Sequence, residues 1–448
     1  MRKVLKKSIF TASIAIILAF TLMFSVLGAN FEHVAENLRD LGLFRGTETG
    51  FELDREPTRA EAVVMMIRFL GLEEAAQAGD ADHPFTDVPA WASSYVAYAY
   101  ELGLTTGATE TEFRPNEVCT AQMFVTFMLR ALGYDDAAGD FTFANAIPFG
   151  TQVGVIDSLL AEGTFLRDDM VAVAFLALNA DPKDAEYDSL LEKLVSEGAV
   201  TLAAAAPILE FFATYAQLEL IDDPFADETN IEMAVNMDID MGILGSVSLT
   251  MNMAMIMEDA DIVMKIDIVM KMGEDEIAMN IFVADGFVYT EIDGEKIKVD
   301  AGLADLDLES MLELTEMSDF TLNPIYFLTS LTKTTQDELT VFTMTFADSF
   351  VEAAMEAAVA MMGTAGVDAD ELAAMGNMEI TVPSMRYYVD ADGNLAKMGM
   401  VMRMVISEEG LTIPINMDFD IEIIAVGDDV VITPPDNLDE FELVEAED

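Results

Sequence analysis

The spacing of apolar residues changes from a helical period to a strand period near residue 230. Before that point, apolar residues recur at intervals of three and four in short segments. This spacing predicts helices over 61–70, 121–132, 170–178, 189–198 and 202–220. After it, apolar and polar residues alternate, which predicts strands with one buried face. The chain therefore divides into a helical half and a sheet-rich half.

The sheet-rich half also contains two segments of helical pattern. We expect helices over 303–332 and 348–376. Besides three long rows between 230 and 272, the alternation predicts strands over 276–283, 287–292, 296–299, 340–346, 378–389, 396–406, 413–424 and 430–432. Long strands with a few helices predict an α+β domain built on one large antiparallel sheet with helical insertions. The acidic tail after Pro434-Pro435 is expected to be frayed.

Methionine dominates the alternating rows, and two interpretations stay open. Methionine at alternate strand positions usually fills a core. The chain has 32 methionines, however, and such rows also suit a soft groove for a lipid or another apolar ligand. The candidate groove residues are Met251, Met253, Met255, Met264 and Met270.

A sequence pattern recurs three times in the first 180 residues. In the fullest copy, Phe85-Thr86-Asp87-Val88-Pro89 is followed by Trp91, by Gly103-Leu104 and by an apolar helix. An offset of 62 carries Phe51 onto Phe113 and Thr58 onto Thr120, and an offset of 108 carries Arg59 onto Arg167. Such a period indicates stacked units that share a core. The copies span about 31–72, 85–133 and 141–178.

The helix of each copy begins at a related motif. Copy one reads Thr58-Arg59-Ala60-Glu61, whose Thr-x-x-Glu spacing is a capping box. Copy two, Thr120-Ala121-Gln122-Met123, has lost the arginine, whereas copy three, Leu166-Arg167-Asp168-Asp169, keeps it. The repeats and these motifs resemble the S-layer homology (SLH) domain, a module that anchors proteins to bacterial cell walls.

This resemblance implies three repeats in one pseudo-threefold, all-α module that binds secondary cell-wall polysaccharide, often pyruvylated. An arginine at a helix N-terminus adds donors to the free backbone N–H groups, which suits a sugar that bears a carboxylate. A purely structural role, in which the arginine caps the helix and forms ion pairs, is the alternative. The carbohydrate-binding residues implied are Thr58, Arg59, Glu61, Asp87, Trp91, Arg167 and Asp169.

The N-terminus predicts secretion. Four basic residues precede an apolar run from Ile9 to Leu27, and Gly28-Ala29 follow. This order is typical of a signal peptide over 1–29, although the run is nearly long enough for an uncleaved anchor. No other stretch is long enough to span a bilayer, so no integral membrane anchor is expected after cleavage. The remaining domains predicted are three SLH repeats with a trailing helix (30–200), a helix and linker (201–229), the β-rich domain (230–436) and the acidic tail (437–448).

Composition removes several classes of function. The net charge of −60 over 448 residues argues against nucleic acid and anionic membranes as partners. The single Cys119 allows no intramolecular disulfide and is expected in a core. His33 and His83 have no partners at metal-ligand or triad spacing and are expected at the surface. We therefore predict no catalytic residue, metal or cofactor.

The layout of the sheet-rich half resembles the LolA/LppX-like half-barrel folds of bacterial envelope proteins. Its late hairpin runs from Tyr387 to Leu395, and Asp390–Asn394 is expected to form a turn rather than a calcium loop. The sequence thus favours a secreted surface protein that SLH repeats anchor to the cell wall or S-layer, with a non-catalytic, exposed, half-barrel-like domain. A wall-anchored carrier of an apolar ligand and an unrecognised hydrolase are the alternatives.

Overall fold

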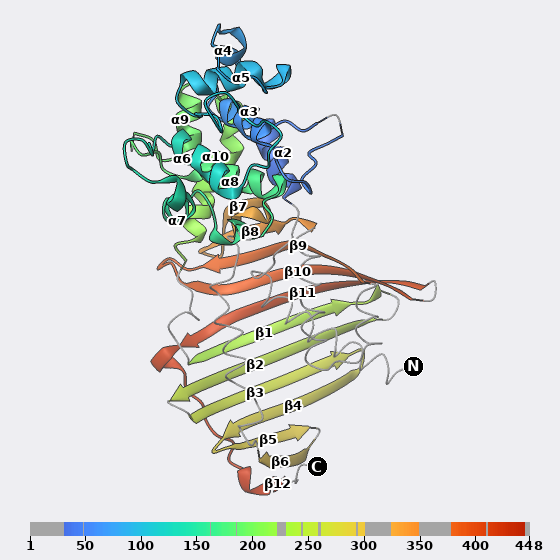
Figure 1. Cartoon of the computed structure of the whole chain (residues 1–448). Helices are drawn as coiled ribbons and strands as arrows, with labels where there is room; N and C mark the ends of the chain where they lie inside the picture. The colour runs from blue at the N-terminus through green and yellow to red at the C-terminus, as the bar shows by residue number, and fades with distance from the viewer. Residues whose placement is uncertain are drawn as a thin grey trace. The chain divides into compact units, whose positions relative to one another are not determined.

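A computed structural model describes residues 31–47, 49–161, 163–184, 186–221, 230–242, 245–258, 261–292, 294–300, 324–348, 378–408 and 411–443 (Figure 1). Two compact units make up the chain. The helical unit extends to Ala213 and also includes a short segment that ends at Phe327. The sheet unit contains the rest of the described chain. The predicted signal segment and most of the predicted helix 348–376 lie outside the described residues.

Short helices build the first unit. They are α2 (Glu32–Asp40), α3 (Arg59–Phe69), α4 (Glu73–Ala78), α5 (Ala90–Glu101), α6 (Ala121–Ala131), α7 (Ala146–Gln152), α8 (Arg167–Asn179), α9 (Leu190–Ser196) and α10 (Leu202–Leu218). The 3-10 turns η1 (Phe143–Asn145) and η2 (Ser158–Ala161) flank α7. None of the helices in the described ranges is both long and apolar enough to cross a membrane.

The predicted helix starts are confirmed. The Thr58 hydroxyl accepts a hydrogen bond from the Glu61 amide, and the Glu61 carboxylate accepts one from the Thr58 amide, so the capping box is complete. Thr120 caps α6 through the amide of Met123. Cys119 is buried, which raises the pKa of its thiol to about 12 and confirms it as a core residue.

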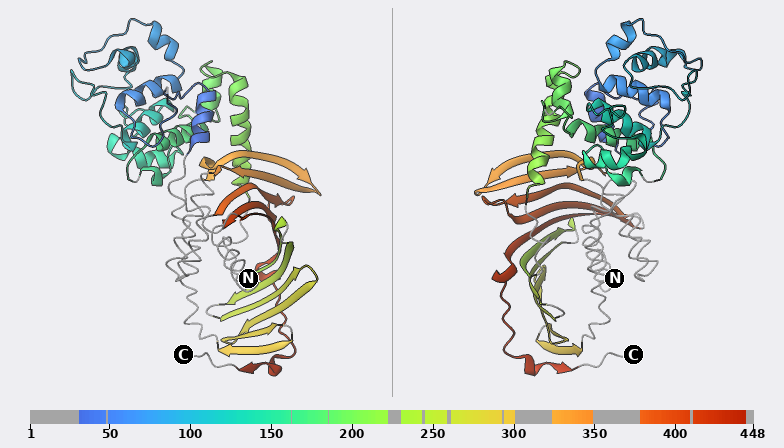
Figure 2. Two further views of the ribbon diagram at one scale, coloured as in Figure 1. Left: turned by 90° about the vertical axis from the view of Figure 1, so that its right-hand side faces the viewer. Right: turned by 60° about the vertical axis from the view of Figure 1, so that its left-hand side comes forward.

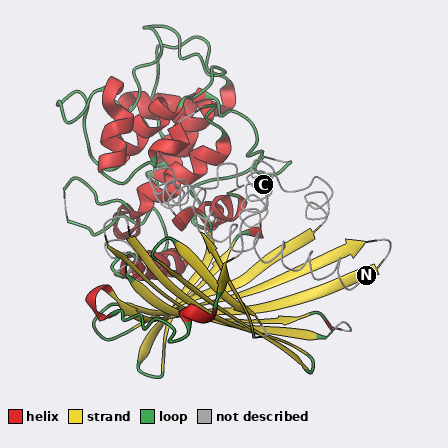
Figure 3. Ribbon diagram, turned by 90° about the horizontal axis from the view of Figure 1, so that it is seen from below, coloured by secondary structure: helices red, strands yellow, loops and turns green. Residues whose placement is uncertain are grey.

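One twelve-stranded sheet forms the second unit. In chain order its strands are β1 (Ile231–Asp240), β2 (Ser246–Glu258), β3 (Asp261–Met272), β4 (Asp275–Ala284), β5 (Phe287–Ile292), β6 (Glu295–Asp300), β7 (Leu328–Gln336), β8 (Leu339–Phe346), β9 (Met378–Val389), β10 (Leu395–Glu408), β11 (Leu411–Val426) and β12 (Glu442–Leu443). Their spatial order is β12-β6-β5-β4-β3-β2-β1-β11-β10-β9-β8-β7. Figure 2 shows this succession from two sides, and Figure 3 shows the curvature of the sheet from below.

Antiparallel pairing gives the sheet two different faces. Met251, Met253 and Met255 pair directly with Ile268, Ile266 and Met264, and Leu249 pairs with Met270. Directly opposed side chains point to the same face, so the five candidate groove methionines share one face. The other face carries polar residues and the ion pairs Lys265–Asp267 and Lys397–Asp420.

Three predictions in the sheet unit are wrong. Residues 328–332, expected at the end of a helix, lie in β7, because pairing with β8 overrides the local apolar spacing. The described residues 430–432 form no strand. The acidic tail is ordered as far as Leu443, since the 3-10 turn η7 (Leu438–Glu440) is followed by β12, which pairs in parallel with β6. The predicted hairpin turn is confirmed, because the Asp390 carboxylate accepts the amides of Asp392 and Asn394 between β9 and β10.

The helical unit contains an aromatic segment that comes from far along the chain. A 3-10 turn, η5 (Pro324–Tyr326), carries Ile325 and Tyr326 into its core together with Phe327. Both aromatic rings contact Phe31, with ring centroids 5.4 and 5.8 Å away. We call Ile325–Phe327 the aromatic plug. It joins the core of the helical unit from a position that follows six strands of the sheet.

His33 lies in the same neighbourhood and is half-buried rather than exposed at the surface, which corrects the prediction. Burial lowers its pKa to about 4, against a weaker opposite effect of a hydrogen bond with the backbone of Tyr326. The imidazole is therefore neutral at pH 7. Local spacing could not reveal this burial, because the plug lies almost 300 positions away along the chain.

Candidate functional site

The N-termini of α3 and α8 bind loops of other copies in the same way. The amides of Arg59 and Ala60 donate to the carbonyls of Glu117 and Pro115. The amides of Arg167 and Asp168 donate to the carbonyls of Arg55 and Leu53. The helix residues differ by the sequence offset of 108 and the loop residues by the offset of 62. The first free N–H groups of each of these helices thus donate hydrogen bonds to a loop of another copy.

The two motif arginines repeat one further contact. Nε of Arg59 donates to the carbonyl of Phe113, and Nε of Arg167 donates to that of Phe51. Each guanidinium carbon also lies 5.1 Å from the centre of an aromatic ring, that of Phe113 or Phe44. Arg167 is only 3% exposed, whereas Arg59 is half-buried. The sequence motif therefore joins the copies to one another in both places.

Glu61 is the centre of an ion-pair cluster that we call the α3 cluster. Its carboxylate accepts two hydrogen bonds from Arg55, at 2.6 and 3.0 Å, and lies 3.4 Å from the Arg167 guanidinium. Burial by itself raises the pKa of Glu61, but the bonds from Arg55 and Thr58 and the charge of Arg167 outweigh it, so the pKa is lowered. The cluster brings together three of the predicted residues, Thr58, Glu61 and Arg167. Arg55 was missed, because no motif spacing marks it.

Asp87 and Arg59 both bind the backbone at Phe113. The Asp87 carboxylate accepts the amides of Phe113 and Arg114, both at 2.8 Å, while Arg59 binds the Phe113 carbonyl. Slight burial raises the pKa of Asp87, and these backbone bonds lower it by more. Trp91 lies in the first turn of α5 and is 56% exposed. It is thus the one member of the predicted set that presents a large aromatic surface to solvent.

The two acids that open α8 are poorly solvated. Burial raises the pKa of Asp168 to about 7 and that of Asp169 to about 6. Asp169 accepts the Leu166 amide and Asp168 accepts the Phe31 amide. Asp169 therefore completes the start of its helix.

The methionine face is graded across the sheet. Met400, Met402, Met404 and Met417 on β10 and β11 are buried. The five candidate groove methionines on β2 and β3 are only half-buried. The methionine face therefore extends from β10 and β11 to β2 and β3, and the five predicted residues lie in its more accessible part. No cluster of three or more histidine, cysteine or acidic side chains within the described ranges is arranged to hold a metal ion.

Two family models match the chain. The S-layer homology domain matches residues 84–120, which include Asp87, Trp91 and Phe113. A family of unknown function, DUF6612, matches residues 226–433 and thus most of the sheet unit.

Curated relatives have names that refer to the cell surface. A cell surface protein of Thermoanaerobacter kivui is 27% identical over 43% of this chain and 28% of its own length. An endoglucanase of Bacillus sp. (strain KSM-635) is 38% identical over 22% of this chain and 10% of its own length. The middle cell wall protein of Brevibacillus brevis is 29% identical over 35% and 15%. The chain spans less than a third of the length of any of these three proteins.

A solved structure, LprF from Mycobacterium bovis, is also similar. It is 15% identical, and the match covers 49% of this chain and 97% of LprF with a TM-score of 0.26. At that score the similarity supports no conclusion about the half-barrel expectation.

The protein therefore carries an S-layer homology domain. It is secreted and associated with the bacterial cell wall, in agreement with the localisation that the sequence predicted.

Proposed function

We propose that three SLH repeats of the helical unit bind a secondary polysaccharide of the cell wall, and that the sheet unit is a non-catalytic domain displayed at the surface. The observation that carries this proposal is the family match over residues 84–120. The repeated hydrogen bonds of α3 and α8 support the extension to three copies, because they join residues at the repeat offsets.

The seven candidate residues have different parts in this proposal. Trp91 supplies an exposed ring on which a sugar stacks. Besides the Nε that binds Phe113, Arg59 has Nη1, which makes a weak contact with Met123 Sδ at 3.6 Å, and Nη2; these two nitrogens pair with a carboxylate on the sugar. Thr58, Glu61 and Arg167 hold the start of α3, Asp87 holds the loop at Phe113, and Asp169 holds the start of α8.

Arg59→Ala is expected to reduce binding of the full chain to purified cell walls by about tenfold, because a charge-assisted pair is lost. Arg130→Ala is the matched control, since Arg130 pairs with Asp136 at the other end of a helix. Co-sedimentation measures the bound fraction, and circular dichroism checks the fold of each variant. Trp91→Ala, at an exposed position, should lower binding without any change in stability. Equal retention of all four proteins would contradict the proposed site.

A second candidate function is the transport or storage of an apolar ligand on the methionine face. The observation in its favour is the half-buried row on β2 and β3. A partly exposed apolar face of this kind is unusual unless it binds something. Methionine suits the purpose because its flexible side chain adapts to irregular ligands.

If the row is a binding face, the native chain should bind an environment-sensitive apolar dye. Met253→Gln should then weaken the binding several-fold, because it places an amide in the row. Asn252→Gln is the control, since its side chain lies on the opposite face of the same strand. A fluorescence titration beside a denaturant curve separates the cases. Dye binding that begins only within the unfolding transition would leave the methionines as ordinary core.

A further inference from the structure

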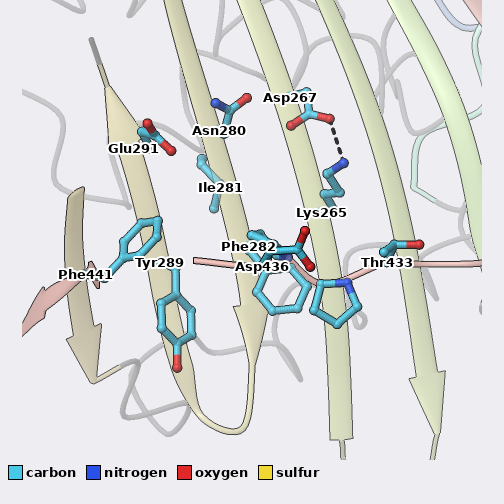
Figure 4. Close-up of a pocket in the computed structure, with 12 residues that line it drawn as sticks. Lys265, Asp267, Asn280, Ile281, Phe282, Tyr289, Glu291, Thr433, Asp436 and Phe441 are labelled. Atoms are coloured by element: carbon cyan, nitrogen blue, oxygen red, sulfur yellow. Dashed lines mark ion pairs between the residues drawn. The ribbon is translucent and has the colours of Figure 1, made fainter. Parts of the chain in front are cut away.

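A hollow of about 350 Å³ lies on the polar face of the sheet unit, above β3, β4 and β5. Its volume is in the lower part of the range of small-molecule sites, roughly 300–1,000 Å³. The segment from Thr433 to Phe441 crosses these strands and forms its rim (Figure 4). Neither the S-layer homology match nor the methionine face includes this place.

Two cross-strand rows of contrasting chemistry form the floor. In the first, Lys265 pairs with Phe282, and Phe282 pairs with Tyr289. In the second, Asp267 pairs with Asn280, and Asn280 pairs with Glu291. Figure 4 shows the polar row side by side with the aromatic one. Because the rows are two residues apart on each strand, roughly 7 Å separates them.

The rim adds groups of both kinds. Phe441 packs edge-on against Tyr289, with ring centroids 5.5 Å apart. Pro434 is exposed, and Asp436 adds a carboxylate. Phe282 and Tyr289 of the floor are buried, so a ligand would meet Phe441 and Pro434 on the apolar side and hydrogen-bonding groups on the other.

Charge limits what this hollow accepts. Three carboxylates line it, those of Asp267, Glu291 and Asp436, and Lys265 is the one cationic side chain among the described lining residues; it pairs with Asp267 at 3.2 Å. An anionic ligand is therefore repelled. Cations already lie over the rings, since Nζ of Lys298 is 4.8 Å from the centre of Tyr289 and Nζ of Lys296 is 5.9 Å from that of Phe441. A cationic ligand would have to compete with these lysines.

We propose that the hollow binds an uncharged saccharide. Sugar hydroxyls donate to carboxylates and both donate to and accept from an amide, so they match the row of Asp267, Asn280 and Glu291. The apolar C–H face of the sugar ring rests on Phe441 and Pro434 of the rim, because Phe282 and Tyr289 beneath them are buried. This second site is separate in chemistry from the wall-anchoring proposal, in which an arginine selects an acidic sugar, and it does not depend on it.

The test is a binding titration of the full chain, followed by saturation-transfer NMR. Maltotetraose, cellotetraose and chitotetraose are the uncharged probes, and tetragalacturonate is the acidic one. At least one uncharged tetrasaccharide is expected to bind, and tetragalacturonate is expected to bind at least about tenfold more weakly to the hollow. Asn280→Ala should weaken the uncharged probe by about tenfold, because two hydrogen-bonding groups are lost at the centre of the polar row.

The chain offers a closely matched control. Asn252 pairs with Asp267 from β2, as Asn280 does from β4, but it lies outside the hollow. Both asparagines are exposed, so neither substitution threatens the fold. Asn252→Ala should leave the affinity unchanged, whereas Asp436→Ala, in the rim, should lower it. The proposal is overturned if no uncharged probe binds, or if Asn280→Ala and Asn252→Ala bind alike. Either result concerns the hollow alone, because sedimentation with cell walls tests the proposed function separately.

Discussion

Phe327→Ala is expected to lower the free energy of unfolding of the helical unit by about 3–5 kcal/mol. Phe327 is 1% exposed and its ring contacts that of Phe31. Truncation to alanine removes buried apolar surface and leaves a cavity, which the short helices around it fill only in part. The effect should therefore appear in helices that precede the mutated residue by more than 140 positions.

Hydrogen exchange followed by mass spectrometry measures this directly. Peptides of α3 and α8 should lose protection in Phe327→Ala. Phe342→Ala is the matched control, because Phe342 is equally buried but belongs to β8 of the sheet unit. Its protection losses should fall on the strands. Unchanged exchange in α3 and α8 of the Phe327 variant would show that the plug does not stabilise the helices.

Glu61→Gln should cost about 2–4 kcal/mol, because it leaves the buried guanidinium of Arg167 without its counter-charge. Glutamine still accepts the Thr58 amide, so the capping box survives and the loss reports the charge. The lower figure allows for the partial exposure of Glu61 itself.

Glu52→Gln is the control for the α3 cluster. Glu52 also pairs with Arg55, but it is partly exposed, and its charge acts on Arg167 less strongly than that of Glu61 does. Its replacement should change the denaturation midpoint little. Urea unfolding of the two variants and of the unmodified chain measures the two losses in free energy of unfolding. Equal losses for both would mean that solvent, rather than Glu61, compensates the charge of Arg167.

The sequence predicted what depends on local period and on repetition. Alternation located most of the strands, and the Thr-x-x-Glu motif located the start of α3. The alignment offsets reappear in the hydrogen bonds of Arg59 and Arg167, because equivalent backbone positions meet equivalent loops. The register that places five methionines on one face also follows from a period of two.

The sequence patterns could not predict contacts between residues far apart in the chain. Ile325–Phe327 reads as part of an apolar helix, and only burial beside Phe31 shows its part in another unit. Arg55 joins Glu61 across a loop whose shape no periodicity describes. Glu442–Leu443 is too short to show alternation, yet it pairs with β6. The hollow above β3–β5 combines three strands with a segment more than 140 residues later in the chain, so local patterns could not reveal it.

The central claim is that the helical unit holds the protein to the wall through a polysaccharide. The most direct measurement is co-sedimentation of residues 30–448 with purified walls, before and after extraction of the secondary polysaccharide from those walls. We expect the chain to sediment with intact walls, to stay in solution with extracted ones, and to be released by the purified polymer. Equal sedimentation with both wall preparations would contradict the account.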